Sequence, residues 1–196
     1  MTRKNFFILA ITLLLLTAGC RRSLPAQPNM RSVTDMAGRT VMVPVDIESA
    51  FTTDPTSAIY LYTLAPDQLL GWNYGLNDIE KSVILEQYHN LPNFGMGDAI
   101  NYEAVISAGP DLIFIVGALN DNLTDQADKL ADQLGIPAVV VDNSLKASPD
   151  AYRFMGELFG VQGEAEALAS YAERTFADIA AMEIPEGKKV RMYYGN

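Results

Sequence analysis

The segment Asp-Leu-Ile-Phe-Ile-Val at residues 111–116 decides the fold class. It is an apolar run rich in β-branched residues, bounded by Gly109-Pro110 and Gly117, and this pattern predicts a strand buried on both faces. The run Ala138–Asp142 has the same character, and Leu123–Leu134 between them has the spacing of an amphipathic helix. Buried strands that alternate with helices indicate an α/β fold whose mostly parallel sheet is covered by helices on both faces.

The same alternation extends on both sides of this unit. Strands are predicted at Arg39–Val43, Ser49–Thr52 and Leu69–Trp72, and helices at Pro55–Leu64, Asn77–Gln87 and Asn101–Ala108. Ser148 is predicted to cap a helix that Gly160 ends, and a long helix follows over Gly163–Met182. We therefore expect a three-layer, Rossmann-like lobe followed by a long helix. Such folds bind ligands at the carboxyl ends of their strands.

The composition of the chain argues against several classes of function. The 196 residues include 24 acidic and 14 basic side chains, and a net charge of −10 repels phosphates, so we expect no nucleic-acid partner. One Cys and one His exclude a disulfide framework and a Cys/His zinc site. Neither a G-x-S-x-G nor an H-E-x-x-H motif occurs. We therefore expect a protein that is not an enzyme.

The N-terminus is predicted to be an export signal. Arg3 and Lys4 precede the apolar run Phe6–Leu16, which is too short to cross a hydrocarbon core of about 30 Å and fits a secretory signal. The small residues before Cys20 are similar to a bacterial lipobox, which implies a signal peptide over 1–19 and a lipid anchor on Cys20. Residues 20–34 are then expected to be a flexible tether. The alternative is a plain signal peptide with an incidental Cys.

Four segments carry a resemblance to a known family. They are Asp35–Pro44 (D-x-x-G-R-x-V-x-x-P), Leu91–Gly95 followed by Asn101-Tyr102-Glu103, Ala108–Ile113, and Leu134–Val139 (L-G-I-P-A-V). In this order the chain resembles the N-terminal lobe of the ABC-transporter solute-binding proteins for ferric siderophores, haem and cobalamin. The resemblance implies an N-terminal lobe over 35–160 and a linking helix over 161–185. Residues 186–196, with a strand expected at Lys189–Tyr194, would start a second lobe that is otherwise absent.

The resemblance also implies a function and sites. The chain would be the substrate-binding component of an ABC importer, exported to the periplasm or cell surface, without a cofactor. It would deliver an iron complex or related metal chelate to a permease in the cytoplasmic membrane. Glu103 would dock on that permease, with a stabilising acid in a helix's first turn as the alternative reading. Met96 and Gly97 would face the ligand cleft.

Further ligand-binding candidates come from the residues themselves. Thr53 and Thr56 follow a predicted strand and can donate hydrogen bonds to a chelate, although N-capping uses the same residue types. Trp72 and Tyr74 can stack on a ligand ring, with core packing as the alternative for Trp72. His89 is more often a solvated residue than a metal ligand in such a polar stretch.

The sequence also fits two other functions. The chain can be a single-lobe accessory lipoprotein that binds a protein partner, or, less favoured, an extracytoplasmic α/β enzyme. A partner other than a permease would support the first, and a hydrolase activity that His89 controls would support the second.

Overall fold

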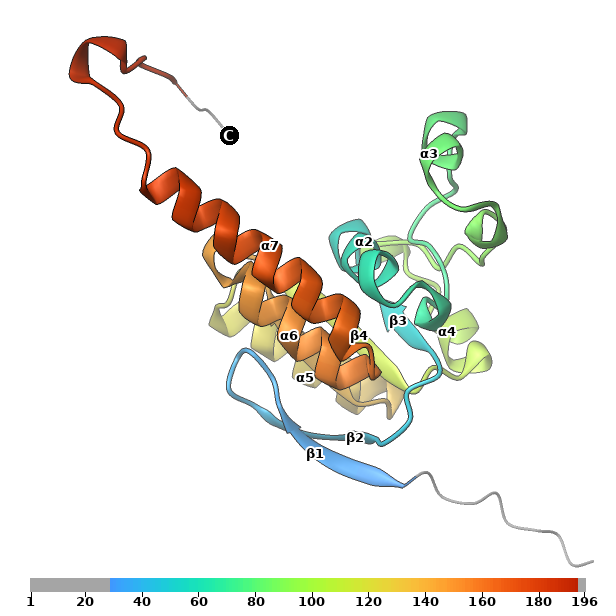
Figure 1. The fold of residues 1–196 in the computed structure, drawn as a ribbon. Helices are drawn as coiled ribbons and strands as arrows, with labels where there is room; N and C mark the ends of the chain where they lie inside the picture. The colour runs from blue at the N-terminus through green and yellow to red at the C-terminus, as the bar shows by residue number, and fades with distance from the viewer. Residues whose placement is uncertain (1–28, 194–196) are drawn as a thin grey trace, which may run out of the picture.

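A three-stranded parallel sheet forms the centre of the computed structural model, which describes residues 29–193 (Figure 1). The strands are β3 (Ala50–Thr52), β4 (Leu112–Gly117) and β5 (Ala138–Asp142), in the order β3-β4-β5. β4 lies in the middle and is buried along nearly its whole length. The stretch at 111–116 is therefore the central strand that its apolar character predicts.

Helices cover both faces of the sheet, which confirms the three-layer α/β lobe (Figure 1). One face packs against α2 and α6, and the other packs against α4 and α5. The helices are α2 (Pro55–Leu64), α3 (Asp78–Val83), α4 (Tyr102–Ala108), α5 (Asp121–Leu134), α6 (Ser148–Phe159) and α7 (Gln162–Ala180). Short 3-10 turns lie at Pro66–Gln68, Glu86–Tyr88, Gly97–Ala99, Leu145–Ala147 and Glu186–Lys188. No helix within residues 29–193 is long and apolar enough to cross a membrane.

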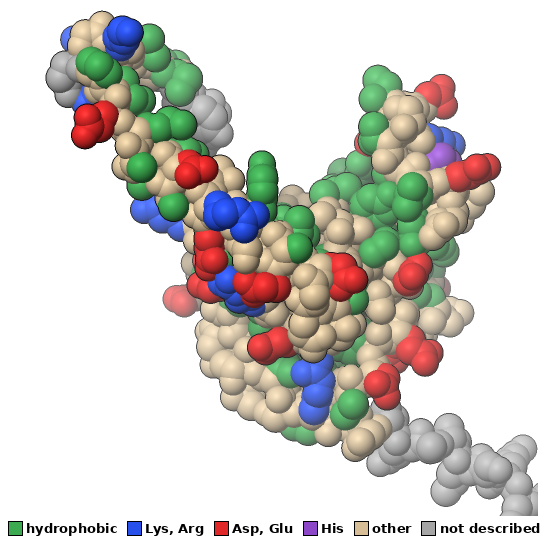
Figure 2. Space-filling model, viewed as in Figure 1, with side chains coloured by type: hydrophobic (Ala, Val, Ile, Leu, Met, Phe, Trp, Pro, Cys, Tyr) green, Lys and Arg blue, Asp and Glu red, His purple; other side chains and the backbone are tan. Residues whose placement is uncertain are grey.

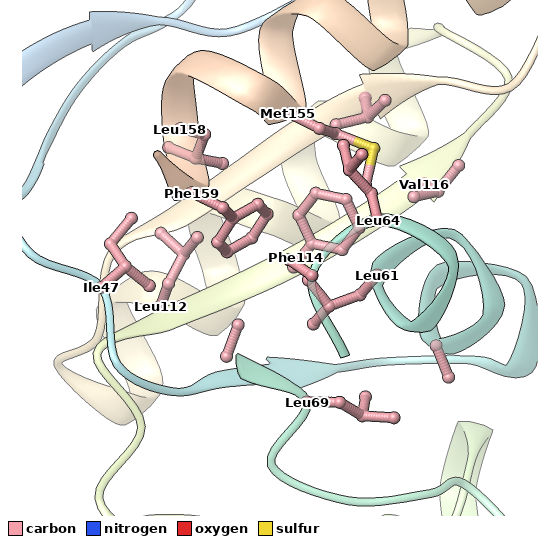
Figure 3. Close-up of a cluster of buried hydrophobic side chains, with 14 of the residues drawn as sticks. Ile47, Leu61, Leu64, Leu69, Leu112, Phe114, Val116, Met155, Leu158 and Phe159 are labelled. Carbon is pink, nitrogen blue, oxygen red and sulfur yellow. The ribbon is translucent and has the colours of Figure 1, made fainter. Parts of the chain in front are cut away.

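The core on the α2–α6 face is centred on Phe114 of β4 (Figure 3). Its side chain is fully buried, and its ring meets Phe159 of α6 edge to face, with 5.5 Å between the ring centroids. Leu61 of α2 and Met155 of α6 are buried in the same cluster. Phe114 therefore connects both helices to the central strand.

The predicted strand at Leu69–Trp72 is only partly correct. The structure has isolated bridges there, from Leu69 to Ala50 and from Trp72 to Asn93, so this segment extends the sheet without forming a regular strand. Gly71 allows the segment that contains Pro92 to approach this part of the chain closely. A Cβ at this position would lie 2.4 Å from the carbonyl oxygen of Pro92.

Three other predictions differ from the structure. The helix expected over 77–87 ends at Val83, because Ile79 and Val83 point to solvent and give it no buried face. Ser148 lies inside α6 instead of capping it, because the preceding 3-10 turn runs into the helix and the Ser148 hydroxyl donates to Leu145 O. The strand expected from residue 189 is absent over the described residues 189–193.

The tether predicted over 20–34 is wrong at its C-terminal end. Met30–Thr34 forms strand β1, which pairs antiparallel with β2 (Thr40–Pro44). The sequence suggested a flexible segment because Pro and polar residues precede it, and the strand's partner comes only after the Asp35–Arg39 turn. Cys20, the proposed signal and residues 20–28 of the tether lie outside the described residues.

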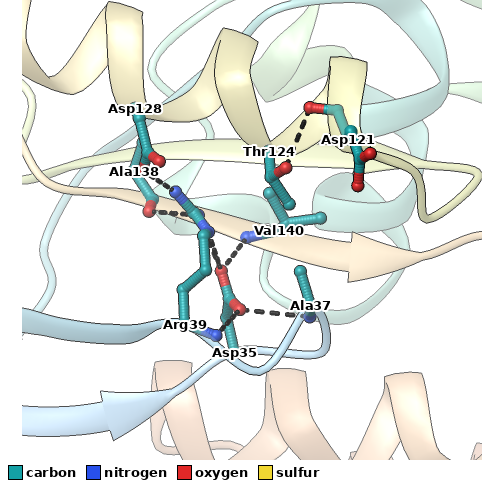
Figure 4. Close-up of polar contacts among 8 residues, drawn as sticks. All are labelled: Asp35, Ala37, Arg39, Asp121, Thr124, Asp128, Ala138 and Val140. Carbon is teal, nitrogen blue, oxygen red and sulfur yellow. Dashed lines mark hydrogen bonds and ion pairs between the residues drawn. The ribbon is translucent and has the colours of Figure 1, made fainter.

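Asp35 fastens this β1–β2 ribbon to the sheet (Figure 4). Its fully buried carboxylate accepts hydrogen bonds from the backbone N–H of Ala37, Arg39 and Val140, at 2.9–3.1 Å. The Arg39 guanidinium pairs with the same carboxylate and also donates to Ala138 O. Gly38 has φ +78°, so the turn between the two strands needs a residue without a Cβ. These bonds explain why the turn has the pattern D-x-x-G-R.

Arg31 of β1 caps the C-terminal end of α6. Its guanidinium donates to the carbonyl oxygens of Glu157 and Leu158, at 3.1 and 2.8 Å. A cation at this end of a helix is also favoured by the helix dipole. We expect Arg31→Ala to lower the free energy of unfolding by about 1–2 kcal/mol. Urea denaturation followed by circular dichroism measures this, and Arg174→Ala, at an exposed position on α7, is the matched control.

The long helix α7 packs along α6 and then runs past the lobe (Figure 1). The two helices approach closely at Gly156, where a Cβ would lie 2.4 Å from that of Ala165. Arg153 of α6 pairs with both Glu166 and Glu173 of α7. With 19 residues, α7 is about 28 Å long, whereas the 12 residues of α6 span about 18 Å. The end of α7 therefore projects from the lobe.

The stability of the packing of α7 against α6 should depend on pH. Hydrogen bonding to Arg153 lowers the pKa of Glu166 to about 2 and also lowers the pKa of Glu173. Carboxyl groups whose pKa is lower in the folded state stabilise it above the unfolded pKa, and that stabilisation is lost as pH falls through the folded value. We expect amide exchange of α7, corrected for intrinsic rates, to accelerate between about pH 4.5 and 2. Arg153→Ala should weaken this dependence, and an unchanged profile would contradict the assignment.

Candidate ligand-binding edge

The carboxyl ends of the strands and bridged segments converge on one edge of the lobe. We call this the carboxyl edge, formed by residues 53–56, 73–77, 95–101, 118–121 and 142–147. The strands are parallel, and Gly117 of β4 is in register with Asp142 of β5, so these loops start side by side. Since α7 runs antiparallel to α6 and is longer, its end rises beside this edge. Figure 2 shows the surface hollowed between the end of α7 and α3.

A buried polar network holds the floor of the carboxyl edge. The side-chain amide of Asn73 donates to the carbonyl oxygens of Thr52 and Gly95, at 2.8 and 3.4 Å. The Thr52 hydroxyl lies 3.4 Å from Asn73 Oδ1, and Asn73 itself is 3% exposed. One amide therefore joins the end of β3 to two loops, which fixes their positions.

Asp54 organises the loop after β3. Its carboxylate caps α2 by accepting from the backbone N–H of Thr56 and Ser57 at 2.8 and 3.1 Å, and it also accepts from the Thr53 hydroxyl. The buried Ser57 hydroxyl donates to Asp54 and accepts from the N–H of Val116. N-capping of α2, the alternative role for Thr53 and Thr56, is therefore performed by Asp54.

Two of the predicted ligand-binding residues line the same pocket. Thr53 and Gly97 both border a cavity of about 340 Å³ between the carboxyl edge and α5. The other lining residues are Asp98, Ile100, Tyr102, Gln126, Lys129, Leu130 and Gln133. Thr56 and Met96 are exposed on the edge outside this pocket, and Met96 is 49% exposed.

Trp72 is a core residue, so the prediction that it contacts ligand is corrected. Its side chain is 3% exposed, and its indole N–H donates to Tyr88 O at 2.8 Å. The ring packs beside Tyr62, whose own ring meets that of Tyr88, and the three residues belong to one buried cluster. Sequence alone left this choice open because a tryptophan at the end of a strand can point either way.

Tyr74 lies half-buried at the edge, where it is partly held by the protein itself. Its hydroxyl donates to Glu80 Oε1 at 2.8 Å, and this hydrogen bond raises the pKa of the Tyr74 hydroxyl. Its ring therefore has a fixed orientation toward α3.

Glu103 is exposed in the first turn of α4, whose N-cap Asn101 accepts from Ala104 N. Its carboxylate has the accessibility that docking requires.

His89 is engaged with the backbone of its own segment. Its Nε2 lies 2.7 Å from Ile84 O, which makes it a local structural contact. Within residues 29–193 no group of three or more His, Cys, Asp and Glu side chains could hold a metal ion. Asp128 of the acidic α5 face pairs with Arg39. The carboxyl edge thus offers hydrogen bonds, aromatic rings and carboxylates to a ligand.

Two features of this region are not apparent from the sequence: the polar side of the pocket and a tyrosine pair. Gln126, Lys129 and Gln133 lie one turn apart on α5, a pattern that also fits an ordinary solvated helix face. Tyr60 and Tyr152 come from helices far apart in the sequence. Only the packing of α2 beside α6 brings their rings together.

Comparisons with known proteins agree with this architecture. No family model matches the sequence, and no curated protein matches it significantly. An ABC transporter solute binding protein from Sulfurospirillum deleyianum superposes with a TM-score of 0.67 at 22% identity, over 81% of this chain and 51% of its own. The molybdate periplasmic binding protein MolA of Haemophilus influenzae gives 0.60 at 17%, over 82% and 56%. The iron-uptake binding protein FeuA of Bacillus subtilis gives 0.56 at 14%, over 76% and 51%.

The chain spans about half the length of the structures that it matches. The chain therefore has the fold of one lobe of an ABC-transporter solute-binding protein.

Proposed function

We propose that the chain is the ligand-binding lobe of an extracytoplasmic solute-binding protein that serves an ABC importer. The observation that carries this proposal is the carboxyl edge, where loops held by Asn73 and Asp54 surround an open surface in the fold of such a lobe. The ligand is an iron complex, such as a ferric siderophore, or a related metal chelate such as haem or a corrinoid. Function is capture and delivery, without a catalysed reaction.

Binding is favoured over catalysis by the chemistry of the edge. The only His in the sequence is tied to a backbone carbonyl, so it is not positioned as a general base for an exposed nucleophile. The pocket that Thr53 and Gly97 border instead presents the polar side chains of α5, and Tyr74 adds one oriented ring. Such an arrangement suits recognition of a ligand that leaves unchanged.

Delivery requires contact with a permease, and Glu103 is the residue proposed for it. It is exposed at a helix start, and an acid there pairs readily with a basic permease side chain. Export and a lipid anchor on Cys20 would hold the lobe near that permease. A fatty-acid label that is incorporated into the chain and lost in Cys20→Ala tests the anchor.

The experiment that tests the proposal combines ligand and partner in one preparation. The chain is extracted from its own membranes in mild detergent with a photoreactive cross-linker at position 103, and the cross-linked product is identified by mass spectrometry. A permease subunit is the expected product, and the same cross-linker at the exposed Asp132 of α5 is the control. Ferric siderophores, haem and corrinoids are then added while thermal stability is measured. Capture of a different protein with no response to any chelate would favour the accessory-lipoprotein alternative.

A further inference from the structure

Two tyrosine rings lie parallel next to the carboxyl edge. Tyr60 of α2 and Tyr152 of α6 have ring planes within 15° of each other and centroids 6.5 Å apart. Both side chains are half-buried, so each ring is supported by the protein and also reaches solvent. α6 starts directly after the edge loop 142–147, which places Tyr152 in the second turn above that loop.

A carboxylate lies at the start of the edge loop that leads into α6. Asp142 is the last residue of β5, and its side chain accepts from the N–H and the hydroxyl of Ser144, at 2.8 and 3.0 Å. These two bonds hold the carboxylate in place and leave it partly exposed. Burial raises the pKa of the Tyr60 hydroxyl, and the nearby charges of Tyr152 and Asp142 raise it further. The Tyr60 hydroxyl therefore keeps its proton at physiological pH.

The charge of the whole edge has the same sign. Its loops contain four carboxylates and one cation: Asp54, Asp98, Asp121, Asp142 and Lys146. No arginine occurs in these loops, so the bidentate pairing by which arginine holds anionic ligands is not available there. The edge consequently repels anions and attracts cations.

We propose that Tyr60, Tyr152 and Asp142 form a subsite for a positively charged group of the ligand, such as an ammonium or alkylated amine. The ring faces attract a cation through their quadrupoles, and the carboxylate supplies the opposite charge. This inference rests on the proposed function and specifies it: the transported complex is cationic or carries a cationic substituent. A metal ion bound directly by phenolates is disfavoured, because the environment opposes loss of the Tyr60 proton.

The test uses a simple cation and its neutral isostere. Choline chloride and 3,3-dimethylbutan-1-ol have nearly the same shape and differ in charge, so any preference between them reports the charge. Each is titrated into protein with isotope-labelled tyrosine rings, and the resonances of Tyr60 and Tyr152 are followed by NMR. Choline should shift both resonances saturably, and the alcohol should bind at least fivefold more weakly.

Variants separate the ring from the charge. Asp142→Asn and Tyr152→Leu should each weaken choline binding about five- to tenfold, whereas Tyr152→Phe, which keeps the ring, should bind choline nearly as well. Asp132→Asn removes an exposed carboxylate near the C-terminal end of α5, outside the edge, and is the matched control. Circular dichroism of each variant shows whether it is folded.

The outcomes distinguish this inference from the proposed function. Equal binding of the alcohol, or no saturable shift of either tyrosine with choline, overturns the cation subsite. The cross-linking of position 103 to a permease does not depend on that result. If the lobe binds choline at this subsite but is not cross-linked to a permease, the subsite is supported and the proposed function is wrong.

Discussion

Replacing Asp35 with alanine will lower the free energy of unfolding by about 3–5 kcal/mol, the largest effect we expect from a polar residue of this chain. The carboxylate has no exposed surface, and it satisfies three backbone N–H groups as well as the Arg39 guanidinium. Its removal leaves the N–H of Val140 without an acceptor and deprives the largely buried guanidinium of its buried counter-charge. Urea unfolding followed by circular dichroism measures the loss.

Two controls show whether the position of this charge is what matters. Asp128→Ala removes the other acid on Arg39, but its side chain is 65% exposed, so the expected loss is below about 1 kcal/mol. Asp35→Asn keeps one acceptor oxygen and should recover only part of the stability. If Asp35→Ala were as mild as Asp128→Ala, the ribbon would not be fastened through this carboxylate.

Phe114→Ala will lower the free energy of unfolding by about 3–5 kcal/mol, because it truncates a buried apolar side chain. The ring is completely buried between Phe159, Met155 and Leu61, so truncation leaves a cavity that three elements border (Figure 3). Domains of this size are stable by only about 5–15 kcal/mol, and the variant should be partly unfolded near body temperature. Thermal unfolding followed by circular dichroism and near-ultraviolet ellipticity measures it.

Phe114→Leu is the matched control, because it keeps most of the apolar volume and loses only the edge-to-face contact with Phe159. Its expected cost is about 1–1.5 kcal/mol. Leu145→Ala, at an exposed apolar residue of the carboxyl edge, should change stability by less than about 0.5 kcal/mol. A loss at Phe114 no larger than that at Leu145 would contradict the packing described here.

The sequence predicts the parts of this fold whose signals are local. β4 and β5 are continuous apolar runs, and α5 has a clear amphipathic spacing that ends at Gly135, whose φ is +68°. β1 was missed because its partner β2 and its anchor Val140 lie later in the chain. The helix predicted over 77–87 failed because Ile79 and Val83 have helical spacing but nothing to pack against.

The same difference between local signals and contacts made by distant residues applies to the candidate site. That ligand-facing residues gather at the carboxyl ends of strands follows from the topology, and Thr53 and Gly97 do line one pocket. Whether Trp72 faces a ligand or the core depends on Tyr62 of α2 and Tyr88 of a later 3-10 turn, and no local periodicity shows that these residues meet it. The pairing of Tyr60 with Tyr152 requires the angle between two helices, and that angle is set by the assembled core.

The order of strands in the sheet has a consequence for how fast this lobe forms. β4 is the central strand, yet its partner β3 precedes it by the whole segment that contains α2, α3 and α4. Asp35 and Val140, which close the ribbon onto β5, are 105 residues apart. Contacts between such distant residues require closure of long loops before they stabilise anything, and chains rich in them fold in milliseconds to seconds. The newly made chain therefore stays open far longer than a helical bundle of the same length.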